Sequence, residues 1–111
     1  MILKELAGKL GITQKNKTDI SSIDIPIGYI GDLLSDVLAH AQSGSLWITI
    51  QKHKNILAVA TAKDLAAIVI VNGIEPEESL LSSADTMDIP VFVTPESSFV
   101  IAGKLYSILG C

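Results

Sequence analysis

The chain has 111 residues, a length typical of one compact domain, and apolar residues of the AVILMFWYC set make up 49% of it, which excludes an intrinsically disordered chain. The 8 basic residues are all lysines, and 12 acidic residues leave a formal net charge of −4, so binding to nucleic acid through a basic surface is not expected. No apolar stretch approaches the ~20 residues that cross a bilayer, and Lys4 and Glu5 interrupt the apolar start, so we expect no membrane span, no secretory leader and a cytoplasmic location.

The N-terminal part predicts a helix, a loop and a strand. Apolar residues recur at helical spacing within residues 1–11, and Gly11 offers the left-handed residue that commonly ends a helix. Residues 12–22 are polar and show no period, so we expect a loop there. Isoleucines at 23, 25 and 27 then alternate with other residues, which predicts an edge strand that reaches Tyr29.

A second helix is expected after Gly31. An apolar stripe runs from Leu33 to Ala41, and Asp32 is placed to accept hydrogen bonds from the amides of the first turn. Gly44 is expected to end this helix.

Three βα units account for the remaining residues. Short apolar runs typical of strands occur at 46–50, 67–71 and 91–93, and each precedes a segment that scans as helix, at 55–63, 77–84 and 97–109. Runs such as 68–71 are apolar on both faces, which predicts parallel strands covered by helices on both sides. We therefore expect a single three-layer α/β domain over residues 1–111, with a mostly parallel sheet of about four strands.

The apolar composition also predicts a homodimer. A domain of this length leaves much of its surface exposed, and a mean hydropathy of +0.49 is high for a monomer. Segment 55–63 is almost wholly apolar, so we expect this helix and the strand that carries Trp47 to form the interface, with Val59 in it if that residue lies at the surface.

Four segments resemble the DRTGG domain, in order and in spacing, over nearly the whole chain: GYIGDLLSDVL (28–38), GSLWITIQKH (44–53), AAIVIVNGIEP (66–76) and IPVFVTPESSF (89–99). Such domains are found at the N-terminus of HPr kinase/phosphorylase, between CBS domains of regulatory pyrophosphatases, and as free-standing bacterial proteins. The positions that give the family its name read Gln51-Lys52-His53 and Val71-Asn72-Gly73 here, so of that motif only Gly73 is retained. The resemblance implies a non-catalytic regulatory or ligand-sensing module, with an adenine nucleotide or another phosphate-bearing effector as the candidate ligand and a separately encoded enzyme as the candidate partner.

The carboxyl edge of the sheet is the expected ligand site, because ligands of open α/β sheets bind beyond the carboxyl ends of the strands. Loops 51–55, 72–75 and 94–98 should meet there, and helices that begin at Asn55 and Ser97 would direct free amides toward an anion. In the alternative interpretation, the loop lysine and histidine are merely solvated and Asn55 and Ser97 are ordinary N-caps. The candidate ligand-binding residues are Lys52, His53, Asn72, Gly73, Thr94 and Ser97.

Two further side-chain patterns have a plain structural alternative. Asp32, Asp36 and His40 follow one another at intervals of four, which could hold a divalent metal but more often forms a solvated helix face with an Asp36–His40 pair. Trp47 could stack on a base, but core or interface packing is the commoner role of such a residue. We therefore expect no metal site and no cofactor, and the single cysteine, Cys111, excludes a cysteine-based metal site.

Catalytic motifs are not found in the sequence. It has no G-x-x-x-x-G-K-[ST] phosphate loop, no nucleophile elbow and no catalytic triad, so we do not expect an enzyme; a small phosphotransferase is the alternative. Residues 3–12 resemble the first helix and turn of a helix-turn-helix DNA reader, which is a further alternative. Residues 13–22 lack the period of a recognition helix, and no arginine is present to bind guanine, so no nucleic-acid partner is expected.

Overall fold

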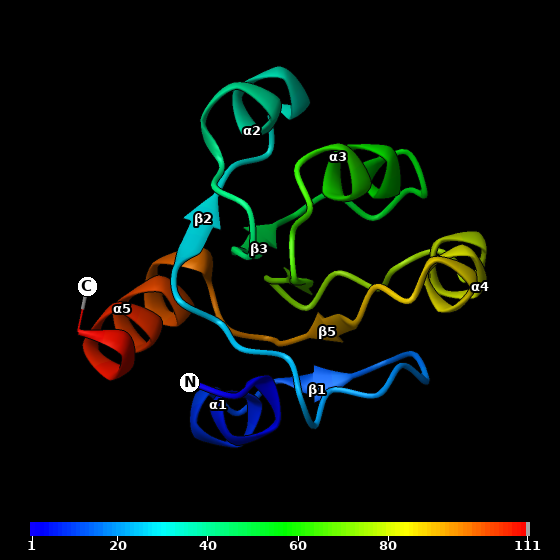
Figure 1. The fold of residues 1–111 in the computed structure, drawn as a ribbon. Coiled ribbons are helices and arrows are strands. Elements are labelled where there is room, and N and C mark those ends of the chain that lie inside the picture. The colour runs from blue at the N-terminus through cyan, green and yellow to red at the C-terminus, as the bar shows by residue number, and fades with distance from the viewer. Residues whose placement is uncertain (111) are drawn as a thin grey trace.

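The computed structural model describes residues 1–110, so Cys111 lies outside the described residues. Helices and strands alternate through most of this range (Figure 1). The elements are α1 (Leu3–Leu10), β1 (Thr13–Gln14), β2 (Gly28–Ile30), α2 (Leu34–His40), β3 (Leu46–Thr49), α3 (Ile56–Ala62), β4 (Ala67–Ile70), α4 (Glu78–Met87), β5 (Val91–Val93) and α5 (Ser98–Leu109).

The strands form one mixed sheet in the order β1-β5-β4-β3-β2. β2, β3, β4 and β5 are parallel neighbours, and β1 pairs antiparallel with β5. The mostly parallel α/β sheet is confirmed, but the expected loop 12–22 contains a fifth strand. The Asn16 side chain explains why a polar segment docks there, because its amide donates to the Ile89 carbonyl at 2.8 Å and its oxygen accepts from the Val91 amide at 3.0 Å.

Helices cover both faces of the sheet, as the doubly apolar strands predict. α2, α3 and α4 connect successive parallel strands and lie on one face, whereas α1 and α5 lie on the other (Figure 1). β4 shows the division: Ala67 and Val69 pack under α1 and α5, and Ile68 and Ile70 pack under the other three helices. The three layers leave β2 and β1 as the two edges of the sheet.

The second strand is shorter than the alternating isoleucines predict. Residues 23–25 bond to the chain's own start, since the Leu3 amide donates to the Ile23 carbonyl at 2.7 Å and the Ile25 amide donates to the Met1 carbonyl at 2.8 Å. Only Gly28–Ile30 therefore joins the sheet. The following helix is also shorter than expected: α2 ends at His40 with Ala41 as its C-cap, so Gly44 does not end it but lies in the next turn with φ of 85°.

The helix-turn-helix interpretation is wrong. Gly11 ends α1 in the left-handed conformation, as expected, but the chain then enters β1 and forms no recognition helix. The apolar face of α1 is buried under the sheet. Within residues 1–110, no helix combines the length and the apolar character that crossing a membrane requires.

The elements expected at a dimer interface are largely covered by their own chain. Trp47 is fully buried on β3, which has a strand on each side, and Val59 on α3 is buried against the sheet. Trp47 and Val59 therefore belong to the protomer's core, and a substitution of Val59 would damage that core.

Candidate functional site

The loop after β3 forms a pocket at the carboxyl edge of the sheet. β3 and β4 run in the same direction, so the segments that follow them leave the sheet at one edge. A pocket of about 250 Å³ lies there, lined by Ile50, Gln51, Lys52, His53 and Ile74. We call it the carboxyl-edge pocket.

Two predicted residues, Lys52 and His53, line the carboxyl-edge pocket, and both are tied to the start of α4. The Glu77 amide donates to the Lys52 carbonyl at 3.1 Å. The Glu77 carboxylate lies 2.8 Å from His53 Nδ1, which is an ion pair when the imidazole is protonated. Sequence reasoning did not identify Glu77 as part of the site, because its position before α4 is also what a helix start requires.

The other predicted residues form a second group at the same edge, where the loops after β4 and β5 are bonded to each other. Asn72 and Gly73 both have positive φ, of 63° and 68°. The Asn72 amide donates to the Glu96 carbonyl at 2.8 Å, and the Gly73 amide donates to the Thr94 carbonyl at 3.0 Å. Because these amides already have protein acceptors, they do not form the open anion cradle that the glycine suggests.

Hydroxyl groups in the second group also have structural partners. Thr94 is buried, and its Oγ accepts from the Glu96 amide at 3.2 Å. Ser97 is the N-cap of α5, with its Oγ accepting from the Val100 amide at 3.3 Å, as the alternative interpretation predicts. Asn55 occupies the N-cap position of α3, as the alternative interpretation predicts, but in helical conformation and without a side-chain capping hydrogen bond.

Charge around the carboxyl-edge pocket is mixed, but two lysines have no acidic neighbour. Glu75 pairs with Lys15 at 3.8 Å, and Glu77 contacts His53. Lys52 and Lys54 are exposed, and in the described part of the chain no carboxylate lies within ion-pair distance of either. Lys52, which lines the pocket, therefore supplies a positive charge there that no carboxylate of residues 1–110 neutralises.

Asp32 positions the pocket loop and does not cap a helix. Its Oδ1 accepts from Thr49 Oγ1 at 2.9 Å and from the Ile50 amide at 2.8 Å, while its carbonyl accepts from Gln51 Nε2 at 2.8 Å. The N-cap of α2 is Leu33, which has no side-chain oxygen. The expected capping role of Asp32 is wrong because its carboxylate binds the end of β3.

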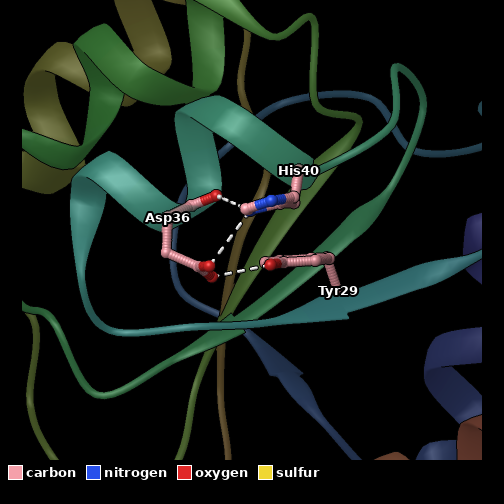
Figure 2. A network of polar contacts seen from close by, with 3 residues as sticks. All are labelled: Tyr29, Asp36 and His40. Atoms are coloured by element: carbon pink, nitrogen blue, oxygen red, sulfur yellow. Dashed lines mark hydrogen bonds and ion pairs between the residues drawn. The ribbon is translucent and has the colours of Figure 1, made fainter.

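Asp36 and His40 form the expected i, i+4 pair on α2, and Tyr29 joins them from β2 (Figure 2). Tyr29 OH donates to Asp36 Oδ2 at 2.6 Å, and His40 Nδ1 lies 3.1 Å from Asp36 Oδ1. The hydrogen bond to the carboxylate raises the pKa of Tyr29, because it stabilises the protonated phenol; burial and the charge of Asp36 act in the same direction. Asp32 is directed to β3, and no group of three metal-ligating side chains is found among residues 1–110.

Trp47 is a core residue. Its side chain is fully buried, and Nε1 donates to the Gly31 carbonyl at 2.8 Å. The indole thus fixes the turn between β2 and α2 and offers no face to a ligand.

The chain is similar in sequence to one known domain family. The model of the DRTGG domain matches residues 2–108. The chain belongs to the DRTGG domain family. No curated protein sequence matches it.

A solved structure shares the fold of this DRTGG domain. It is the CBS and DRTGG domains of the regulatory region of Clostridium perfringens pyrophosphatase, complexed with the activator diadenosine tetraphosphate. The TM-score is 0.70 at 16% sequence identity, and the match covers 93% of this chain and 46% of that one. This chain thus spans about half the length of that regulatory region.

Proposed function

We propose that this DRTGG domain is a non-catalytic regulatory module of the cytoplasm that binds a small phosphate-bearing ligand in the carboxyl-edge pocket and acts on a separately encoded enzyme. The observation that carries the proposal is the pocket of about 250 Å³ beyond β3 and β4, with Lys52 in its wall. This is where open α/β sheets bind their ligands.

The chemistry of the carboxyl-edge pocket fits a ligand with one anionic and one apolar part. Ile50 and Ile74 supply apolar walls, and Lys52 supplies a cation with no carboxylate partner within residues 1–110. The Glu77 carboxylate beside His53 repels an anion, so the phosphate is expected on the Lys52 side.

The size of the pocket favours a mononucleotide or a smaller ligand. Sites for drug-sized ligands occupy roughly 300–1,000 Å³, and about 250 Å³ holds one phosphate with part of a nucleoside. The related pyrophosphatase region binds diadenosine tetraphosphate. A ligand of that length would extend beyond this pocket.

Calorimetric titration with AMP, ATP, diadenosine tetraphosphate and inorganic phosphate tests the proposal. A charge-assisted hydrogen bond contributes about 1.5–3 kcal/mol, so Lys52→Ala should weaken binding of the best ligand at least about tenfold. Lys104→Ala, which removes an exposed lysine from α5, is the matched control and should leave the affinity unchanged. No binding by any of the four compounds, or equal losses in both variants, would refute the site.

A phosphotransferase would give a different result in the same samples. With ATP and magnesium, the regulatory module should release no ADP and acquire no phosphate. ATP turnover that disappears on His53→Ala or Ser97→Ala would overturn the non-catalytic proposal.

A further inference from the structure

The outer edge of β2 has unused main-chain hydrogen-bonding groups. β2 is the last strand of the sheet and pairs only with β3 (Figure 1). The Ile27 carbonyl accepts from Leu46 and the Gly31 amide donates to Ile48, so these two residues face β3. Alternation along the strand then directs the amides and carbonyls of Gly28 and Ile30 outward.

Apart from the shortness of β2, which has three residues, this edge lacks the features that normally prevent strand pairing. Exposed edges are usually protected by charged side chains, proline or a covering element. The other edge of the sheet has such protection, because Lys15 and Lys17 follow β1 and the Lys17 amide donates to Asp85 at 2.8 Å. Gly28–Ile30 carries no charge, and Pro26 lies before the strand.

An apolar groove runs beside the open edge. It has a volume of about 390 Å³ and lies between β2 and α5, lined by Ile27, Gly28, Tyr29, Ile30, Ile48, Ala102, Leu105 and Tyr106. We call it the β2–α5 groove. It contains no charged side chain.

α5 presents two exposed aromatic side chains beside the groove. Phe99 is 86% exposed and Tyr106 is 68% exposed. They are two helical turns apart and therefore lie on one face of α5, with Ala102 and Gly103 between them. Large exposed apolar side chains next to a groove are typical of a protein interface.

We propose that a second copy of this chain docks on the β2–α5 groove through a two-fold axis at Tyr29. Antiparallel pairing of the two β2 strands would place Gly28 opposite the partner's Ile30, so all four outward amides and carbonyls gain partners. The same operation places both α5 helices on one face of the joined sheet, where Phe99 and Tyr106 meet the equivalent surface.

Exposed apolar area lies beside the open edge of β2. A stable interface buries about 800 Å² per partner. An aromatic side chain buries about 150–250 Å², so Phe99 and Tyr106 at these exposures would supply roughly 300 Å² per protomer. Ile30, which is 45% exposed, and the groove walls add to this apolar area. No charged side chain lines the groove, so the contact buries no like charges, and the net charge of −4 adds only a long-range repulsion that salt screens.

Sedimentation equilibrium of the full chain with two variants and one control tests the interface. The unmodified chain should sediment at about twice the 11.8 kDa of one chain at micromolar concentration. Ile30→Lys and Phe99→Lys should each raise the dimer dissociation constant at least about tenfold, because each places an unpaired charge in the contact. Met87→Lys is the matched control, since Met87 on α4 is also 45% exposed, and it should leave the constant unchanged.

Amide hydrogen exchange separates strand pairing from other contacts. The amides of Gly28 and Ile30 should exchange more slowly as protein concentration rises, and Phe99→Lys should remove this dependence. A chain that stays monomeric at micromolar concentration, a dimer that both lysine variants leave intact, or exchange at Gly28 and Ile30 that does not depend on concentration would each overturn the proposal.

Discussion

Replacing Gly28 by alanine tests how closely α5 packs against β2. A methyl group on Gly28 would overlap the Leu105 Cδ2 atom, whereas the Leu46 carbonyl oxygen at 3.5 Å and Leu105 Cγ at 3.6 Å are ordinary contacts. The conflict therefore involves one terminal methyl group of one buried side chain.

The cost of this substitution follows from what Leu105 must do. Leaving its rotamer costs about 0.5–1.5 kcal/mol, and overpacking a core typically costs about 1–3 kcal/mol. Alanine also lowers the conformational entropy of the unfolded chain, which offsets about 0.4–1 kcal/mol of this loss in the free energy of unfolding. We expect Gly28→Ala to lower the free energy of unfolding by about 1–2 kcal/mol and the Tm by roughly 5–10 °C.

Urea unfolding of a double-mutant cycle, at one protein concentration, measures the contact itself. Leu105→Ala alone should cost about 2–5 kcal/mol. In that background Gly28→Ala should cost little, because the atom it overlaps is gone, which gives a coupling of about 1–2 kcal/mol. Gly8→Ala is the control: this residue lies within α1, and a methyl group there would meet no atom of another element within 4 Å, so alanine should stabilise by up to about 1 kcal/mol. Equal costs for Gly28→Ala in both backgrounds would refute the packing argument.

Two further substitutions test polar contacts of the turn after β2. Trp47→Phe should lower the free energy of unfolding by about 2–3 kcal/mol, because it leaves the Gly31 carbonyl without its donor and opens a cavity; an unchanged urea midpoint would contradict this. Tyr29→Phe should flatten the alkaline limb of the stability–pH curve. The folded-state pKa of Tyr29 is raised, so its contribution is complete below the unfolded value of 10.0 and is lost as pH rises through the folded value. Chemical denaturation of both proteins from neutral to alkaline pH measures the difference, and parallel curves would show that the Asp36 contact has no such effect.

The layers of this domain could be predicted from local pattern. Strand β5 falls at Val91–Val93 as predicted, and the doubly apolar run around Ile68 and Ile70 correctly indicates helices on both faces. Such features depend on side-chain spacing along one segment, and spacing is fully contained in the sequence. The residues of the carboxyl edge follow for the same reason, because parallel strands end together.

The partners of individual polar and apolar groups were decided by tertiary contacts. Asp32 satisfies the helix-cap pattern equally well in sequence, but the end of β3 lies near enough to bind its carboxylate. Asn16 looks like a loop residue until Val91 of β5 supplies an amide, and Ile89 just before that strand supplies a carbonyl, for its side chain.

The sequence by itself determined the α/β class, the succession of βα units along the chain and which loops meet at the carboxyl edge of the sheet. Only the tertiary structure decided which apolar residues are left for a partner: it covers Trp47 and Val59 and leaves Phe99 and Tyr106 exposed. The physical reason is that burial depends on which distant segment lies against a side chain. Periodicity shows that a residue belongs to an apolar face, but not whether that face meets its own chain.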